Sequence, residues 1–152
     1  MSVPLLVLWL HLLGGIVWVG GVMFQAHVLL PGARRGDARG FAEAARRGRP
    51  VAWSAIALVV LTGLYTVTRL GPLERILESG AALTLAGKFM LVLLAVTIAA
   101  QRDFAQVPRL RRALAAGQDP APALRAIAWM DRVVLLLAVV VVYLGLAISR
   151  AV

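Results

Sequence analysis

Residues 3–30, VPLLVLWLHLLGGIVWVGGVMFQAHVLL, form the stretch that decides the fold. The stretch contains no Asp, Glu, Lys or Arg. A helix of about 20 predominantly apolar residues is long enough to cross the hydrocarbon core of a bilayer. Because lipid cannot satisfy backbone polar groups, such a stretch must be helical. It begins without a positively charged region and is too long for a cleaved signal peptide, so we interpret it as a retained first span.

Three further apolar runs follow, at about residues 51–70, 81–100 and 126–148. Hydrophobic residues make up 61% of the chain, and the mean hydropathy is +0.88. Soluble domains are usually about 45–50% apolar, so the excess must face lipid. The sequence therefore predicts an all-α integral membrane protein, a single domain over residues 1–152 that forms a four-helix bundle.

The arginines gather in the first and third connectors, and the second connector is nearly neutral. The formal net charge is +9, but the charges lie between apolar runs, which is typical of contact with anionic lipid headgroups and argues against nucleic-acid binding. The positive-inside rule places these two connectors in the cytoplasm. Both termini are then expected on the outer, periplasmic side of a bacterial inner membrane that the chain crosses several times.

Prolines and glycines suggest where the first two spans end and begin. Pro31 and Gly32 are expected to end the first span. Residues 37–47 predict a short interfacial helix with Phe41 facing lipid. Pro50 is expected at or near the first turn of the second span, where proline is common. We find no internal repeat in the sequence.

The composition also excludes several kinds of chemistry. The chain has no cysteine, which rules out disulfides, thiolate metal sites and cysteine-based catalysis. It shows no Ser–His–Asp order, glycine-rich phosphate loop or HExxH pattern, so hydrolase and nucleotide-binding functions have no support.

Two ionisable residues are expected at the same depth in the outer half of the bundle. His11 lies in the first span and Lys88, the only lysine, in the third. Both should lie about 10–12 Å below the outer surface, at 1.5 Å of rise per residue. Ionisable residues inside a membrane are costly, and each is therefore a candidate functional residue. In the plainer interpretation, His11 bonds a backbone carbonyl and Lys88 extends to the surface.

Met23 and His27 form a second candidate site, because their i, i+4 spacing puts them on one helix face. Thioether and imidazole ligands suit copper, especially Cu(I). The alternative is that Met23 only packs and His27 stays hydrated near the interface. His11 and His27 cannot share one ion, because they lie about 24 Å apart along the helix. Asp131 and Arg132, near the inner start of the fourth span, are interpreted as interfacial anchors.

Two stretches carry a family resemblance: LHLLGGIVWVGGVMFQAHVLLP at residues 10–31 and GKFMLVLLAVTIAAQRDFAQVPRL at residues 87–110. Together they resemble the CopD-type copper-resistance membrane domain. More distantly, they are similar to HemJ-type protoporphyrinogen oxidases, small helical membrane proteins associated with b-type haem. His11 and Lys88 match the His and Lys positions of both groups, and Trp18 matches the aromatic position.

The favoured interpretation is a membrane protein that binds haem b or a porphyrin, and, if it is an enzyme, a haem-dependent oxidoreductase. His11 would be an axial ligand of the haem iron. Lys88 would pair with a propionate, serve as the second ligand or act in catalysis. We prefer haem because the charge of Lys88 beside a single histidine repels copper ions. The remaining predicted pocket residues are Gly14, Gly15, Tyr65 and Tyr143.

Two alternatives remain. The first is a CopD-like protein for copper transport or homeostasis, with Met23 and His27 as ligands, supplemented by His11, Met90 and Met130. The second is an accessory subunit of a membrane complex that has no cofactor of its own and uses the glycines of the first span for helix packing. The bilayer is the predicted partner, and a homodimer or a larger membrane complex is left open.

Overall fold

The computed structural model describes residues 2–69 and 81–151, and helices account for nearly all of them. No β-strand occurs in these two ranges. The predicted second connector, residues 71–80, lies outside the described residues. The elements in chain order are α1 (Val3–Phe24), η1 (Gln25–Leu29), α2 (Leu30–Gly32), η2 (Ala33–Asp37), α3 (Ala38–Thr68), α5 (Ala81–Gln101), η3 (Arg102–Gln106), α6 (Val107–Ala115) and α7 (Ala121–Ala151).

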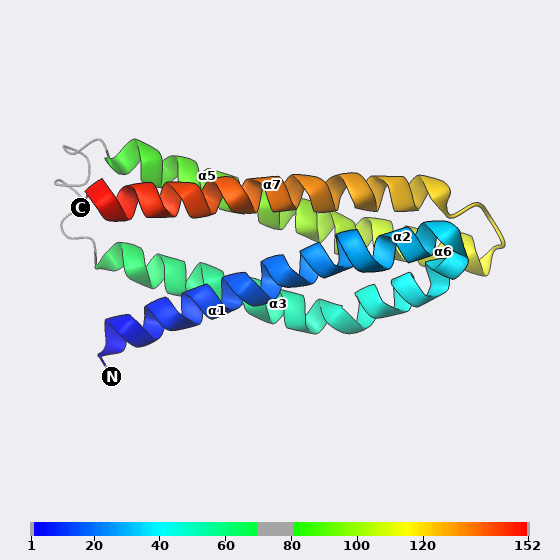
Figure 1. The fold of residues 1–152 in the computed structure, drawn as a ribbon, viewed down its shortest axis with the longest axis horizontal. Helices are drawn as coiled ribbons and strands as arrows, with labels where there is room; N and C mark the ends of the chain where they lie inside the picture. The colour runs from blue at the N-terminus through cyan, green and yellow to red at the C-terminus, as the bar shows by residue number, and fades with distance from the viewer. Residues whose placement is uncertain (1, 70–80, 152) are drawn as a thin grey trace.

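The long helices pair as two antiparallel hairpins, α1 with α3 and α5 with α7, which lie side by side (Figure 1). Gly36 reverses the chain between α1 and α3 with a φ of 123°, a conformation that glycine adopts without strain. Three helical stretches are long and apolar enough to span a membrane: Val3–Thr68, which includes the reversal, Ala82–Ala115 and Ala121–Ala147. The prediction of a helical membrane protein is thus confirmed.

The first span does not end at Pro31, as the sequence suggested. The helix continues through η1 and α2 into η2, where Gly36 breaks it. In η1 the N–H group of Leu30 bonds the carbonyl of Gln25, five residues back, which widens the helix just before Pro31. Proline in an ordinary α-helix clashes with the carbonyl four residues back, and the wider π-helical turn accommodates it.

The second helix begins at Ala38, earlier than residue 51. Asp37 caps α3 by accepting a hydrogen bond of 3.0 Å from the Gly40 N–H. Pro50 consequently lies inside α3 and not at its first turn. Phe41 is 2% exposed, so the prediction that it faces lipid is wrong. The first turns of α3 precede its apolar segment, and there Phe41 packs against side chains of α6 and α7 and not against lipid.

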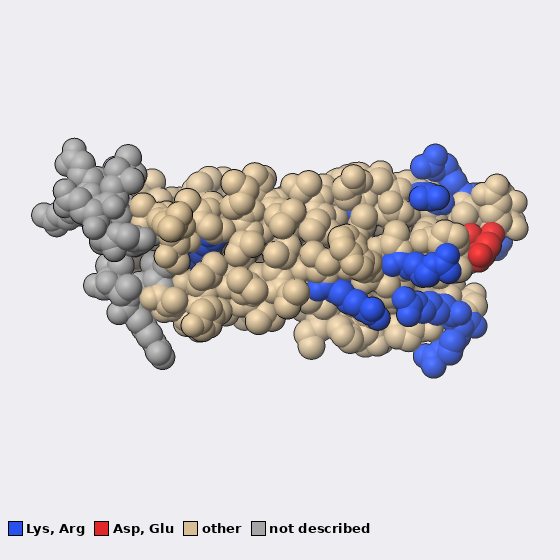
Figure 2. All heavy atoms as spheres, turned by 90° about the horizontal axis from the view of Figure 1, so that it is seen from above, with Lys and Arg blue, Asp and Glu red and all other residues tan. Residues whose placement is uncertain are grey.

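Two hydrophobic clusters hold the helices together. The first gathers Phe41, Leu110, Val107 and Ile127, together with several alanines, from α3, α6 and α7. The second surrounds Trp18. Figure 2 shows positively charged side chains concentrated at one end of the molecule. We call this the arginine-rich end; its exposed arginines are Arg34, Arg35, Arg39, Arg46, Arg47, Arg109, Arg111, Arg112 and Arg125.

Candidate functional site

His11 is half-buried on α1 and contacts α3. Its Nδ1 lies 2.9 Å from Thr62 Oγ1. The Thr62 hydroxyl donates its only proton to the Leu58 carbonyl, so its oxygen accepts from His11. Nδ1 of the neutral imidazole is therefore the protonated nitrogen, and Nε2 keeps a free lone pair. A metal-binding histidine commonly has this arrangement, in which the second ring nitrogen is fixed by an outer partner.

Lys88 is half-buried on α5 and lies near His11. A Cβ atom added to Gly145 of α7 would lie 3.2 Å from Lys88 Nζ, so the absence of a side chain at Gly145 makes room for the ammonium group. The charge of Lys88 acts electrostatically on the His11 imidazole. The two residues that share a predicted depth thus also share a neighbourhood between the two hairpins.

The two glycines predicted to accommodate a macrocycle do not leave a shared space. A Cβ at Gly14 would lie 2.9 Å from Val59 Cγ2 and 3.1 Å from the Ala55 carbonyl oxygen. Helix α3 therefore already fills the space beside Gly14, which allows α1 and α3 to approach closely. Gly15 has no such neighbour within 4 Å. Gly14 is a packing glycine, in agreement with the alternative interpretation of the first span.

The two predicted tyrosines do not line a common pocket. Tyr143 is 70% exposed and projects outward from the bundle. The Tyr65 hydroxyl accepts a hydrogen bond of 2.8 Å from Arg69, whose guanidinium also lies 5.2 Å from the centre of the Tyr65 ring. Tyr65 thus interacts with Arg69, at the end of its own helix, α3.

Met23 and His27 both face outward. Met23 is 57% exposed, and His27 is exposed as well. His27 Nδ1 lies 3.1 Å from the Met23 carbonyl oxygen, to which it can only donate. Its Nε2 is therefore also free, but the pair faces the surroundings of the bundle. Within the described part of the chain, no three or more His, Cys, Asp or Glu side chains group closely enough to hold a metal ion.

The structure reveals a buried ionic cluster that the sequence did not lead us to expect. Arg102 Nη1 donates to Asp103 Oδ1 at 2.6 Å, and Arg102 Nε lies 2.6 Å from Asp131 Oδ1. All three residues are buried, and Asp131 is completely so. The interpretation of Asp131 as an interfacial anchor is therefore wrong, because the packing of α7 against η3 carries its carboxylate into the protein.

Neutral and cationic side chains complete the cluster. Arg102 also donates to the Gln25 side-chain oxygen of η1. Trp53 Nε1 donates to Asp103 Oδ2 at 3.0 Å, and Arg49 donates to the Asp103 carbonyl at 2.7 Å. In the sequence, the only indication was an Arg–Asp pair inside a long helix that continues to Pro108. Asp131, its third charged member, could not be paired with Arg102 before the helices were placed.

A cavity of about 280 Å³ lies beside this cluster. Residues from α1, α3 and the α5–η3 helix line it, and its polar lining is supplied mainly by Gln25, Arg49, Arg102 and Asp103. Apolar side chains, including Trp18, form most of the remaining wall. The cavity thus joins the ionic cluster to the hydrophobic interior of the bundle.

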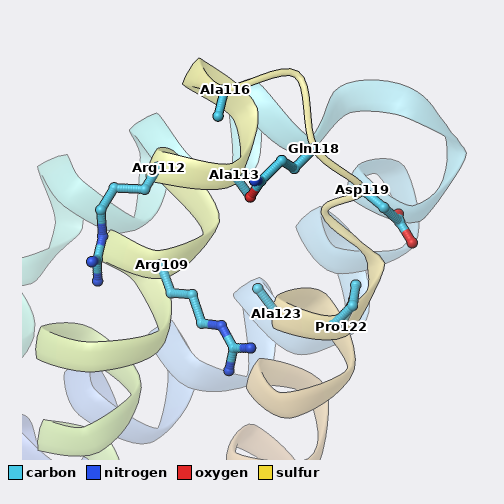
Figure 3. A pocket seen from close by; sticks show the side chains of 8 residues that line it. All are labelled: Arg109, Arg112, Ala113, Ala116, Gln118, Asp119, Pro122 and Ala123. Atoms are coloured by element: carbon cyan, nitrogen blue, oxygen red, sulfur yellow. The ribbon is translucent and has the colours of Figure 1, made fainter.

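A larger hollow, of about 500 Å³, lies at the arginine-rich end between α6 and the start of α7 (Figure 3). In Figure 3 the Arg109 guanidinium reaches toward α7, and Asp119 points away from it. Asp119 instead caps α7 by accepting a hydrogen bond of 2.9 Å from the Ala121 N–H. Arg109 and Arg112 are exposed there, as expected for arginines that contact lipid headgroups.

Comparison with known proteins identifies a family. The family model described as CopD, copper resistance protein D, matches residues 42–148, which include Lys88 and the buried ionic cluster. His11 precedes the matched segment. No curated protein and no solved structure matches the chain. No comparison supports the more distant similarity to HemJ-type oxidases or a bound haem, so the findings favour copper, our alternative, over haem. Because the match extends over well more than half of its length, the chain belongs to the copper resistance protein D family.

Proposed function

We propose that this chain transports or supplies copper across the bacterial cytoplasmic membrane. Membership of a copper-resistance family is the observation that carries the proposal. With no cysteine in the chain, protein ligands suited to Cu(I) must come from two histidines and four methionines. A copper site in this protein therefore depends on a small number of side chains that can be tested one at a time.

His11 is the ligand that the geometry supports best. It lies between the hairpins, its Nδ1 is fixed by Thr62, and its Nε2 is free to bind a metal. His27 also has a free Nε2, but it faces away from the other helices. A site on His27 and Met23 would therefore need a partner or a second copy of the chain to complete it, in line with the open prediction of a homodimer or larger complex.

Lys88 would set how tightly copper is held at His11. As a cation it repels Cu(I), which keeps the site weak enough to release the ion. Without its proton, the same nitrogen offers a second ligand beside the imidazole. A transporter needs such a site, because an ion that is bound too tightly does not move on.

The proposal includes a topology in which α1, α3, α5 and α7 each cross the membrane once. The arginine-rich end then faces the cytoplasm, as the positive-inside rule requires. Both chain ends lie at the opposite end of the molecule in Figure 1, so both would be periplasmic. His11 and Lys88 would then be reached from the outside.

Copper binding to the purified protein in mild detergent tests the proposal. We expect the His11→Ala variant to lose bound Cu(I), and the matched variant His27→Ala to keep it. Lys88→Met, which removes a charge and adds a thioether, should bind Cu(I) more tightly. Loss of copper in His27→Ala alone would move the site to Met23 and His27. A Soret band in the absorption spectrum that disappears in His11→Ala would instead restore the haem interpretation.

A further inference from the structure

The two hairpins are related by an internal repeat. Gln25 begins η1 and Arg102 begins η3, and these two residues are 77 positions apart. Each begins a five-residue π-helical segment that is followed by a buried residue and then by proline, Pro31 or Pro108. In each segment the residue before the proline bonds the carbonyl five residues back. Two irregular segments of the same kind at matching positions indicate that the hairpins are copies of one unit.

Buried positions repeat in the same register. Leu30 and Val107 match under this shift, as do Ala33 and Leu110, and all four are buried in the same cluster. Trp18 matches Ala95, and both are buried in the second cluster. Because the repeat preserves buried positions but little residue identity, it is visible in the fold and not in the sequence.

His11 and Lys88 are also equivalent residues in this repeat. His11 Cε1 would lie 3.4 Å from a Cβ added to Gly63 of α3, and Lys88 Nζ would lie 3.2 Å from a Cβ added to Gly145 of α7. In each hairpin, then, the outer polar side chain packs over a glycine of the second long helix. His11 and Lys88 thus occupy the same structural position, one in each hairpin.

Equivalent residues that touch each other must lie near the symmetry axis that relates them. Arg102 donates to Gln25, its equivalent, which places this pair near the axis. His11 and Lys88 are not in contact with each other, but Lys88 is near enough for its charge to act on the His11 imidazole. Parallel repeats in transporters are related by an axis along the membrane normal, with the substrate path between them. Here the axis runs from His11 and Lys88 past Trp18 to Gln25 and Arg102, a distance of about 21 Å at 1.5 Å per residue.

We propose that copper moves along this axis between the hairpins, and that Arg102, Asp103 and Asp131 form the gate at its arginine-rich end. This inference rests on the proposed transport function. In the present structure the gate is closed, because the guanidinium of Arg102 joins η1, η3 and α7 across the axis. A passing ion must part these contacts.

The carboxylates of the gate can themselves attract the ion. Asp131 Oδ2 is buried and has no hydrogen-bond partner among the described residues. The cation that holds Asp131 is Arg102, and Asp103 shares that same guanidinium. Asp103 lines the adjoining cavity, whereas Asp131 lies behind it, fully buried. A cation that enters the cavity therefore competes with Arg102 for the Asp103 carboxylate, and binding of the ion weakens the hold of Arg102 on the gate. Binding of the ion and opening of the gate are thus one event.

Thiol labelling tests the gate without requiring copper, because the chain has no cysteine of its own. The reporter is a single cysteine, Ala95→Cys. Ala95 is buried and lies between Arg102 and Lys88 along the axis. Protein in sealed vesicles is treated from the arginine-rich side with a membrane-impermeant thiol reagent. The reporter should react slowly with Asp131 in place, and on the order of tenfold faster or more with Asp131→Asn, since a buried ion pair loses one partner.

Two further variants keep the test decisive. Asp119→Asn changes an exposed aspartate of the same end and should leave labelling unchanged. Trp53→Phe removes the hydrogen bond to Asp103 and keeps an aromatic ring beside Phe104. It should give intermediate labelling, even if Asp131→Asn does not fold. Equal labelling in all backgrounds would overturn the gate. Copper uptake by the same vesicles is measured separately, so that an absence of transport counts against the proposed function and unchanged labelling counts against the gate.

Discussion

The two ends of this molecule are built differently. At the arginine-rich end, large side chains such as Phe41, Leu110 and Ile127 are 2% exposed or less, and three charged side chains are buried together. At the opposite end, His11 and Lys88 are only half-buried, and most of α1 before Gly14 is exposed. The arginine-rich end is held together by packing between its own helices, whereas the surface of the opposite end must be covered by what surrounds the bundle. We expect substitutions at the first end to change stability and substitutions at the second to change copper binding.

Of the substitutions that test this difference between the two ends, Arg102→Ala should lower the stability of the fold the most. It leaves the carboxylates of Asp103 and Asp131 buried without their shared cation. Removing one partner of a buried ion pair destabilises by about 3–5 kcal/mol. Unfolding of the detergent-solubilised protein, followed by circular dichroism, measures the effect. The control is Arg111→Ala at an exposed position of the same end, where a loss below about 0.5 kcal/mol is expected. Equal losses in the two variants would show that the cluster does not stabilise the fold.

Gly14→Val tests the boundary between the two ends. The new Cβ would lie 2.9 Å from Val59 Cγ2, so α1 and α3 must separate. Overpacking of this kind costs about 1–3 kcal/mol. Gly15→Val is the matched control, because no atom lies within 4 Å of a Cβ there. A thermal unfolding midpoint lowered by both substitutions alike would argue against close packing at Gly14.

Thr62→Val should act on copper and much less on the fold. It removes the oxygen that accepts from His11 Nδ1, so the imidazole loses one of the partners that orient it. Loss of such an outer partner lowers metal affinity by about 10–100-fold. Competition with a Cu(I) chelator measures the affinity. Thr97→Val is the control, because Thr97 also bonds its own helix but is exposed. Unchanged affinity in Thr62→Val would remove His11 from the proposed site.

The same contrast explains how much of the protein could be predicted from its sequence. Helices and lipid-facing surfaces follow from local apolar runs, and His11 and Lys88 stand out because each is polar within such a run. Asp131 and Phe41 were misplaced because their surroundings come from segments distant in sequence. An aspartate beside an arginine looks like an interfacial anchor until another helix buries it. The repeat was missed for a related reason, since it conserves burial and helix geometry more than residue type.

Glu43→Gln should have the smallest effect, although Glu43 makes two ion pairs. Hydrogen bonds from Arg46 and Arg47 lower the pKa of Glu43 to about 2. Because the pKa is lowered on folding, any stabilisation is complete above the ordinary pKa of about 4.5 and is lost as the pH falls toward 2. Both arginines are exposed, and exposed pairs are screened by solvent and salt. Unfolding midpoints of the two proteins should therefore coincide from pH 8 to 5. A clear difference at pH 7 would show that the arginine-rich end is held by its surface charges as well as by its buried ones.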